Sequence, residues 1–249
     1  MTLNSFQTIL ASRFGIIIFI FGKLLRFGLY LTFIYFLYTG TKGVVGYDRN
    51  KMLLFLLNFS FLGAVGQMLF REAYRFRTKL VSGEFDFDLV KPVHPLLKNL
   101  AGGFDLLDLL TMPVFIYVLY KVLSLINFNT SQFIFYGLLF MNGLMIMFAI
   151  HVSVLAFGII TTEVDHLVMV YRDLETMGRF PVDIYREPLR QFLTFAVPVG
   201  IMFTFPVKAI LGLLSWQGML AAFILGGLSC YFSLRFWNFA VMKYSSASS

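Results

Sequence analysis

The chain has 249 residues, of which 59% are hydrophobic, 18% are aromatic and only 13% are charged, and its mean hydropathy is +0.80. A soluble domain carries about 25% charged residues, so this composition excludes a soluble globular protein, a disordered chain and a small disulfide scaffold. The formal charge of +7 comes from 20 Lys and Arg against 13 Asp and Glu. In a membrane protein such an excess mainly sets the topology, so we expect a lipid bilayer and no nucleic acid as a partner.

Six hydrophobic segments are predicted to cross the membrane, because a helical span needs about 20 apolar residues. They cover approximately residues 24–39, 52–70, 105–126, 133–160, 192–207 and 218–239. The nine residues before Lys23 are too few to cross, so we expect an interfacial helix there and no removable signal peptide. The sequence therefore predicts one all-α integral membrane domain over residues 1–249, with a cytoplasmic loop at residues 71–104.

Residues 163–178 form a helix whose place in this arrangement is open. Apolar residues occupy one helical face, and Glu163, Asp165, Arg172 and Asp173 occupy the other. A charge near the centre of a span costs about 2.5–3.5 kcal/mol on insertion scales, and each Leu or Val returns only about 0.3–0.6 kcal/mol. We therefore expect this helix at a membrane surface. In the alternative it crosses inside the bundle and makes the proline-containing run after it a re-entrant hairpin.

The distribution of basic residues orients the chain. With the N-terminus inside and the helix of residues 163–178 at the surface, 15 of the 20 Lys and Arg lie inside, and the five outside are Lys42, Arg49, Lys51, Lys121 and Lys208. In the alternative, three arginines move outward and the split becomes 12 to 8. The positive-inside rule favours the first arrangement, with both termini cytoplasmic.

The sequence shows no catalytic or metal-binding constellation. Gly22-Lys23 lacks the earlier Gly and the following Ser or Thr of a phosphate loop, so this chain is not expected to bind ATP. His94, His151 and His166 have neither metal-binding spacing nor a cysteine partner, so no metal is expected.

Four polar residues within the predicted spans have two possible roles. Asn58, Gln67, Asn142 and His151 either line a translocation cavity or form hydrogen bonds between helices. His151 could also relay protons. Outside residues 163–178 no Asp, Glu, Lys or Arg lies mid-span, which disfavours an ion-coupled carrier.

The last predicted span carries a stripe of small residues. Gly218, Ala222, Gly226 and Cys230 recur at every fourth position, so they lie one turn apart on one face. Small side chains let two helices approach closely in lipid. The partner helix belongs either to the same chain or to a second subunit.

The loop after the second span alternates acidic residues at positions 84, 86 and 88 with apolar residues at 85, 87 and 89. In an extended segment this pattern gives one carboxylate side and one apolar side, which suits docking to a partner. The alternative is a solvated loop whose aromatic residues rest on lipid headgroups. Pro92 and Pro95 exclude a continuous helix. Arg71, Arg75 and Lys79, four residues apart, could instead bind the carboxylates within the chain.

The stretch Gly83-Glu84-Phe85-Asp86-Phe87-Asp88-Leu89-Val90-Lys91-Pro92-Val93-His94-Pro95-Leu96 resembles the signature of ABC-2 type permeases, in the branch related to viologen and multidrug exporters. Weaker similarities lie at residues 179–185, at Val197-Pro198 and Phe205-Pro206, and at residues 243–246. The resemblance implies a six-helix permease bundle in a bacterial inner membrane, which forms the translocation pathway as a dimer with the same chain or a paralogue.

It also implies two separate ATP-binding subunits that hold ATP and Mg, so the chain would not be an enzyme by itself. The residues implied to couple to the ATPase are Glu84, Phe85, Asp86, Phe87, Asp88, Leu89, Lys91, Pro92, His94 and Pro95. A non-transporting membrane scaffold or accessory subunit is the alternative function.

Overall fold

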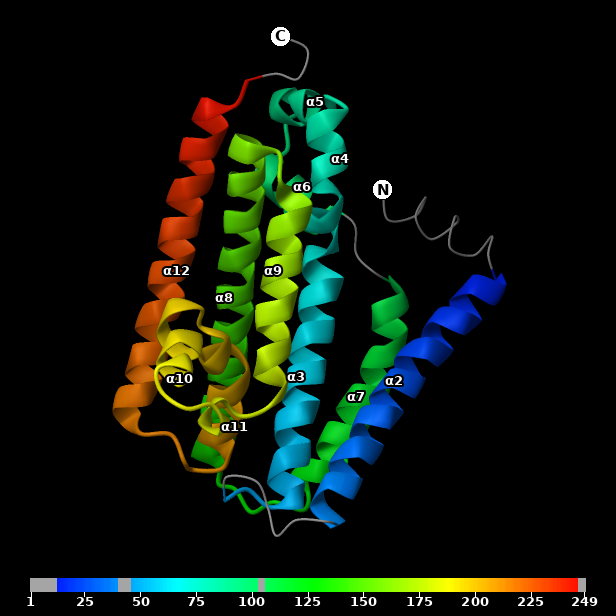
Figure 1. Ribbon diagram of the computed structural model, residues 1–249, viewed down its shortest axis with the longest axis vertical. Coiled ribbons are helices and arrows are strands. Elements are labelled where there is room, and N and C mark those ends of the chain that lie inside the picture. The colour runs from blue at the N-terminus through cyan, green and yellow to red at the C-terminus, as the bar shows by residue number, and fades with distance from the viewer. Residues whose placement is uncertain (1–12, 40–45, 103–105, 246–249) are drawn as a thin grey trace.

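Long apolar segments form the long helices of the structure (Figure 1). The computed structural model describes residues 13–39, 46–102 and 106–245, and within these ranges the chain forms helices and turns but no β-strand. This confirms the predicted all-α class. By length and composition, residues 49–81, 130–161 and 216–243 can each cross a membrane, and a bent pair at residues 189–210 makes a fourth if it counts as one span.

Five long helices build the bundle: α2 (Arg13–Thr39), α3 (Arg49–Phe70), α7 (Leu106–Leu123), α8 (Thr130–Thr161) and α12 (Trp216–Lys243). Three of them begin at a side-chain cap, which satisfies an otherwise unpaired backbone N–H group. Asp48 accepts from Lys51 N–H, Asn129 from Gln132 N–H and Ser215 from Gly218 N–H.

The first helix differs from the expectation. Instead of a short interfacial helix followed by a span at residues 24–39, α2 runs without a break from Arg13 to Thr39. The segment contains no proline that would interrupt the backbone hydrogen bonds, and its glycines are tolerated within a helix.

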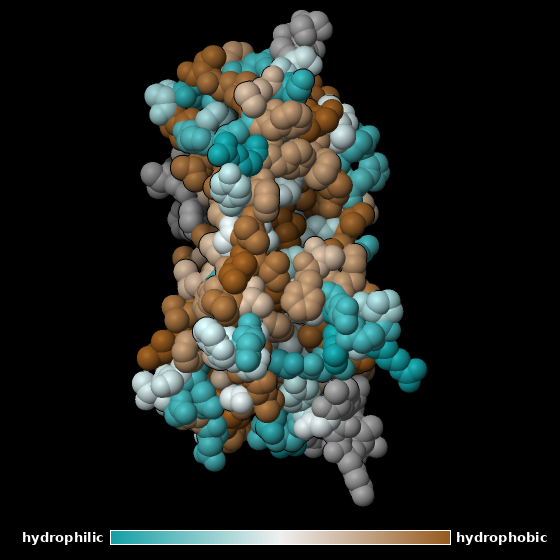
Figure 2. All heavy atoms as spheres, turned by 90° about the vertical axis from the view of Figure 1, so that its left-hand side faces the viewer, coloured by the Kyte–Doolittle hydropathy of each residue, from teal (hydrophilic) through white to brown (hydrophobic). Residues whose placement is uncertain are grey.

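The central helix of the bundle is α8, which contacts α12, α9 and α3. In Figure 1, α12 lies on one side of α8 and α3 on the other, while α7 and α2 lie beyond α3. Figure 2 shows that the face carrying α12 is mostly hydrophobic through its middle, with hydrophilic residues gathered towards both ends. Such a band is what a bilayer requires of a protein surface.

Short helices occupy the two ends. After α3 come a 3-10 turn at Arg71–Arg75, α4 (Phe76–Val81), α5 (Glu84–Val90) and α6 (Pro95–Ala101). We call α4, α5 and α6 the hairpin. It lies at the same end of the bundle as the C-terminus of α12, and we call this end the hairpin end. The opposite end carries Tyr47 and the turns that lead into α8 and α12, and we call it the Tyr47 end.

The charged segment at residues 163–178 forms α9 (Val164–Thr176), and its position corrects the expectation of a surface helix. It returns along α8 from the hairpin end, where a Cβ atom at Gly158 would meet Val164 Cγ2 at 2.4 Å. Further down, a Cβ atom at Gly63, within the apolar part of α3, would lie 3.6 Å from Glu175 Oε1. The apolar face of α9 packs on α8 and on the 3-10 turn and α4 that follow α3, which compensates for the charged residues on its other face.

The run predicted as a span at residues 192–207 is bent. Residues 189–196, comprising α10 (Leu189–Gln191) and a π-helical turn (Phe192–Ala196), meet residues 200–210 at an angle of 81°. The second arm contains another π-helical turn (Gly200–Thr204) and α11 (Phe205–Ile210). Val197 is extended because the residue before a proline avoids the helical conformation, and Pro198 lacks an N–H group.

An ion pair fixes this bent segment at the Tyr47 end. Asp183, in a 3-10 turn at Val182–Ile184, accepts a hydrogen bond from Tyr47 at 2.9 Å and pairs with Lys208 Nζ at 2.7 Å. Burial, followed by the hydrogen bond to Asp183 and its charge, raises the pKa of Tyr47. The run thus enters and leaves the bundle at one end, as in the alternative re-entrant arrangement.

Candidate functional site

Local sequence signals shape the hairpin of α4, α5 and α6. Gly83 has φ +74°, a left-handed conformation that glycine adopts readily, and it turns the chain between α4 and α5. Lys91 is extended ahead of Pro92, and α5 ends there. His94 Nδ1 accepts a hydrogen bond from Leu96 N–H at 3.3 Å, and Pro95 is the first residue of α6.

The residues at 84–90 form a helix, so the expected extended segment with one row of carboxylates is wrong. Carboxylates at Glu84 and Asp86 lie in the first turn of α5, where the helix dipole favours negative charge. The helix turns Phe85 and Asp88 inward together, whereas Phe87 is 65% exposed. Positions three apart therefore share a face instead of positions two apart.

Phe85 forms the centre of an aromatic cluster that joins α5 to the rest of the bundle. Its side chain is fully buried, and its ring lies 5.1 Å from Phe76 and 5.0 Å from Tyr244. It also lies 6.3 Å from Trp237 of α12, and all three ring pairs are edge-to-face. Edge-to-face pairs stabilise more than their buried area alone, so Phe85 attaches the hairpin to α12.

Asp88 anchors α5 to α6 electrostatically. Its carboxylate is buried and forms an ion pair with Lys98, and Lys91 Nζ lies 3.5 Å from the same oxygen. Burial alone raises the pKa of Asp88, but hydrogen bonds from Lys98 and Asn99 and the charges of nearby lysines outweigh burial and lower it. The carboxylate is therefore charged at neutral pH.

Lys79 of α4, one of the three basic residues suggested to bind the loop carboxylates, binds other groups. Its Nζ lies 2.6 Å from Glu72 and donates to Asn99 at 3.1 Å. Glu72 also lies 3.8 Å from Arg75. No spacing rule pointed to Lys98, because it reaches Asp88 only after the chain turns at Pro92.

The hairpin exposes several apolar groups. Five of its large hydrophobic side chains are between 52% and 81% exposed, namely Val81, Phe87, Val90, Val93 and Leu97. Lys91, Pro92 and His94 are exposed beside them, and Leu89 is half-buried. This surface combines apolar anchors with a polar rim, an arrangement typical of protein–protein contacts.

The polar residues within the spans form hydrogen bonds between elements. Asn58 donates to the Phe203 carbonyl at 2.8 Å and accepts from Tyr136 at 3.1 Å. Asn142 of α8 donates to the Ala222 carbonyl of α12 at 3.0 Å. These contacts correspond to the packing alternative for both residues.

His151 and Gln67 differ in their surroundings. His151 is buried, with Nε2 3.2 Å from the Tyr74 hydroxyl and Nδ1 2.8 Å from the Met147 carbonyl. Gln67 is exposed on α3. The position of His151 again corresponds to helix packing.

The small-residue stripe of α12 meets α8 of the same chain. Ala222 is fully buried, and a Cβ atom at Gly226 would meet Asn142 Oδ1 at 2.1 Å. Gly218, at the start of the stripe, faces Leu214 and Ser215, and Cys230 is half-buried. The close contact at Gly226 allows α12 to approach α8.

The hydropathy pattern did not predict a carboxylate in the middle of the bundle. Glu175 lies on α9 beside Gly63 of α3, where a Cβ atom would be 3.6 Å from its Oε1. Its amphipathic helix resembles a surface element in sequence, and only the packing of α9 against α3 places it within the apolar depth of the bundle.

Among the described residues, no three His, Cys, Asp or Glu side chains are grouped to hold a metal ion. At the exposed start of α9, Glu163 Oε2 lies 2.6 Å from His166 Nδ1.

Comparison with family models matches residues 24–248 to a family described as ABC-2 family transporter protein. The chain belongs to the ABC-2 transporter family. It is a multi-pass membrane protein and the permease component of an ABC transporter, a component that is not itself catalytic. Permeases of the ABC-2 family usually work with an ATP-binding subunit. Comparison with curated proteins and with solved structures gives no match.

Proposed function

We propose that this ABC-2 permease is the transmembrane subunit of an ATP-driven exporter in a bacterial inner membrane. It forms the translocation pathway as a dimer and couples to two separate ATP-binding subunits, which hold ATP and Mg. The family membership supports transport, and the exposed apolar side of the hairpin supports the position of the ATPase contact.

The hairpin end is the cytoplasmic end in this proposal. If α9 crosses the membrane, the topology assigns 11 Lys and Arg to the side of the hairpin end and 8 to the opposite side, with Arg172 within α9. Exposed Arg75, Arg77 and Lys91 are among the 11. The positive-inside rule therefore supports cytoplasmic termini even with the smaller asymmetry.

Two groups of hairpin residues have different tasks. Phe87 and Val90, 65% and 81% exposed, supply apolar area that an ATPase groove would bury. Buried apolar anchors carry most of the affinity at such contacts, often about 2 kcal/mol or more each. Glu84 and His94 are exposed on the rim, where charge mainly orients and steers the partner.

Phe85 and Asp88 transmit the movement instead of binding the partner. They attach α5 to α12 and α6, so a force on Phe87 reaches the long helices through packed rings and the ion pair with Lys98. Interior packing is dense and deforms little, so a displacement of α5 is passed on to α12 and α6 through these contacts.

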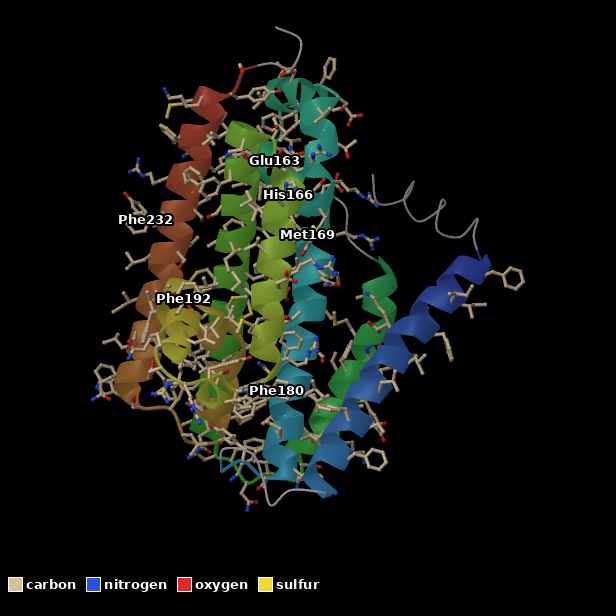
Figure 3. The ribbon with its side chains drawn as sticks, viewed as in Figure 1. Glu163, His166, Met169, Phe180, Phe192 and Phe232 are labelled. Atoms are coloured by element: carbon tan, nitrogen blue, oxygen red, sulfur yellow. The ribbon has the colours of Figure 1, made fainter. Side chains whose placement is uncertain are left out.

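Purification of the tagged full-length chain from its native membranes tests this function. We expect an ATP-binding subunit to copurify, and Mg-ATP hydrolysis to require that subunit. Phe87→Ala should reduce copurification about tenfold or more. The matched control is Phe232→Ala, 62% exposed on the side of α12 that faces away from the hairpin, and it should copurify normally (Figure 3). ATP hydrolysis by the isolated chain, or equal effects of the two variants, would contradict the proposal.

A further inference from the structure

The outward face of α9 carries charges on a helix that packs along the bundle. Val164, Val168 and Tyr171 are buried against neighbouring helices. The residues exposed on the opposite side are Asp165, His166, Met169, Val170, Arg172, Asp173 and Thr176. Figure 3 shows His166 and Met169 following Glu163 along α9, beside α3 and α8. This face has polar and apolar groups but no covering element in the described part of the chain.

The depth of α9 makes this exposure significant. Near the hairpin end Asp165 lies 3.5 Å from Arg77, and at the other end Glu175 lies beside Gly63 of α3. Between Met52 and Phe70, α3 has no charged residue. Arg172 and Asp173 therefore lie alongside an apolar part of the bundle, where contact with lipid is unfavourable for both charges.

The charges on this face can pair with those on the same face of a second copy. At about 100° per residue, Met169 and Thr176 lie seven positions apart on nearly one line, while Arg172 lies on one side of that line and Asp173 on the other. When two parallel helices are related by a twofold axis, each flank of one meets the opposite flank of the other, as in a parallel coiled coil. Arg172 of each copy then faces Asp173 of the other.

We propose that a second copy of this chain packs against the outward face of α9, with Met169 and Thr176 at the seam and two symmetric Arg172–Asp173 ion pairs beside it. The inference rests on the proposed function because it locates the subunit contact of that dimer. The small-residue stripe of α12 does not serve as the seam, since Ala222 and Gly226 already contact α8 of the same chain.

Charge reversal in two separately tagged copies tests the pairing. Copies carrying Arg172→Asp place Asp opposite Asp, and copies carrying Asp173→Arg place Arg opposite Arg, so each alone should associate about tenfold or more weakly. Mixed together, the two variants restore opposite charges at both positions and should form a heterodimer. A general folding defect would not be rescued by mixing. The matched control is Arg190→Asp, which removes an exposed pair with Glu187 within the chain and should leave association unchanged.

Disulfide crosslinking locates the contact. Cys230 is the only cysteine, so Thr176→Cys in a Cys230→Ser background gives one reactive site, and a mild oxidant should join two full-length copies there. Ile224→Cys, 52% exposed on α12, should not crosslink.

The outcomes separate this inference from the proposed function. A dimer by light scattering without a Thr176→Cys crosslink, or without rescue of the charge-reversed pair, overturns the α9 seam but leaves the dimer. If one permease copy alone with its ATPase hydrolyses Mg-ATP, both the α9 seam and the proposed dimer are overturned.

Discussion

Replacing Phe85 with Ala should release the hairpin from the bundle, whereas replacing Phe87 should not. Phe85 is fully buried, and truncation of a buried Phe costs about 3–5 kcal/mol of folding free energy. Its edge-to-face contacts with Phe76, Trp237 and Tyr244 place the expected loss in the upper part of that range. Phe87 is 65% exposed, so its truncation should change stability by about 0.5 kcal/mol or less.

The assay combines amide hydrogen exchange with thermal unfolding of the purified full-length chain. In Phe85→Ala the amides of α5 and α6 should lose protection, and the C-terminal turn of α12 should follow because Trp237 loses a packing partner. Phe85→Leu keeps most of the buried area and should fall between the parent and Phe85→Ala. Native protection in Phe85→Ala, or equal destabilisation by Phe87→Ala, would refute the assignment of Phe85 as the internal anchor.

Three further changes probe other parts of the bundle. Acidification should loosen α5 from α6: because the folded state lowers the pKa of Asp88, its stabilisation is present above the ordinary carboxyl pKa of about 4 and is lost as the pH falls through the lowered value. Hydrogen exchange should follow that profile, and Asp88→Asn should expose the hairpin amides already at neutral pH. Gly226→Leu should prevent normal assembly, measured by size-exclusion chromatography, because its Cβ would lie 2.1 Å from an amide oxygen on α8, whereas Gly227→Leu meets nothing within 4 Å and should assemble. In intact cells, a cysteine at Thr41, which lies outside the described residues, should react with an impermeant reagent and one at Ser245 should not; the reverse pattern contradicts the orientation.

Local signals in the sequence account for the helices themselves. Apolar runs become α3, α7, α8 and α12, since lipid leaves a buried backbone few alternatives to the helix. Pro92 and Pro95 separate α5 from α6, and Pro198 bends the run at residues 189–210, because proline removes a hydrogen-bond donor wherever it occurs. The motif of residues 83–96 indicated the family that the family model matches.

Short-range patterns were ambiguous where two periodicities fit the same residues. Alternating acidic and apolar positions at 84–89 suit a strand, yet two turns of helix satisfy the backbone and bury Phe85 and Asp88 on one side. Two partners decide this. Trp237, which contacts Phe85, lies more than a hundred residues further along the chain, and Lys98, which pairs with Asp88, lies after the chain reverses direction. No local window contains them.

Tertiary structure alone decided the depth of α9. Its composition describes an amphipathic helix, and the insertion cost of its charges predicts a surface position for an isolated segment. In the bundle, α8, the 3-10 turn at residues 71–75 and α4 cover its apolar side, and Glu175 lies beside Gly63 of α3. The free energy of a segment in a membrane depends on what its neighbours cover, and those neighbours come from distant parts of the chain.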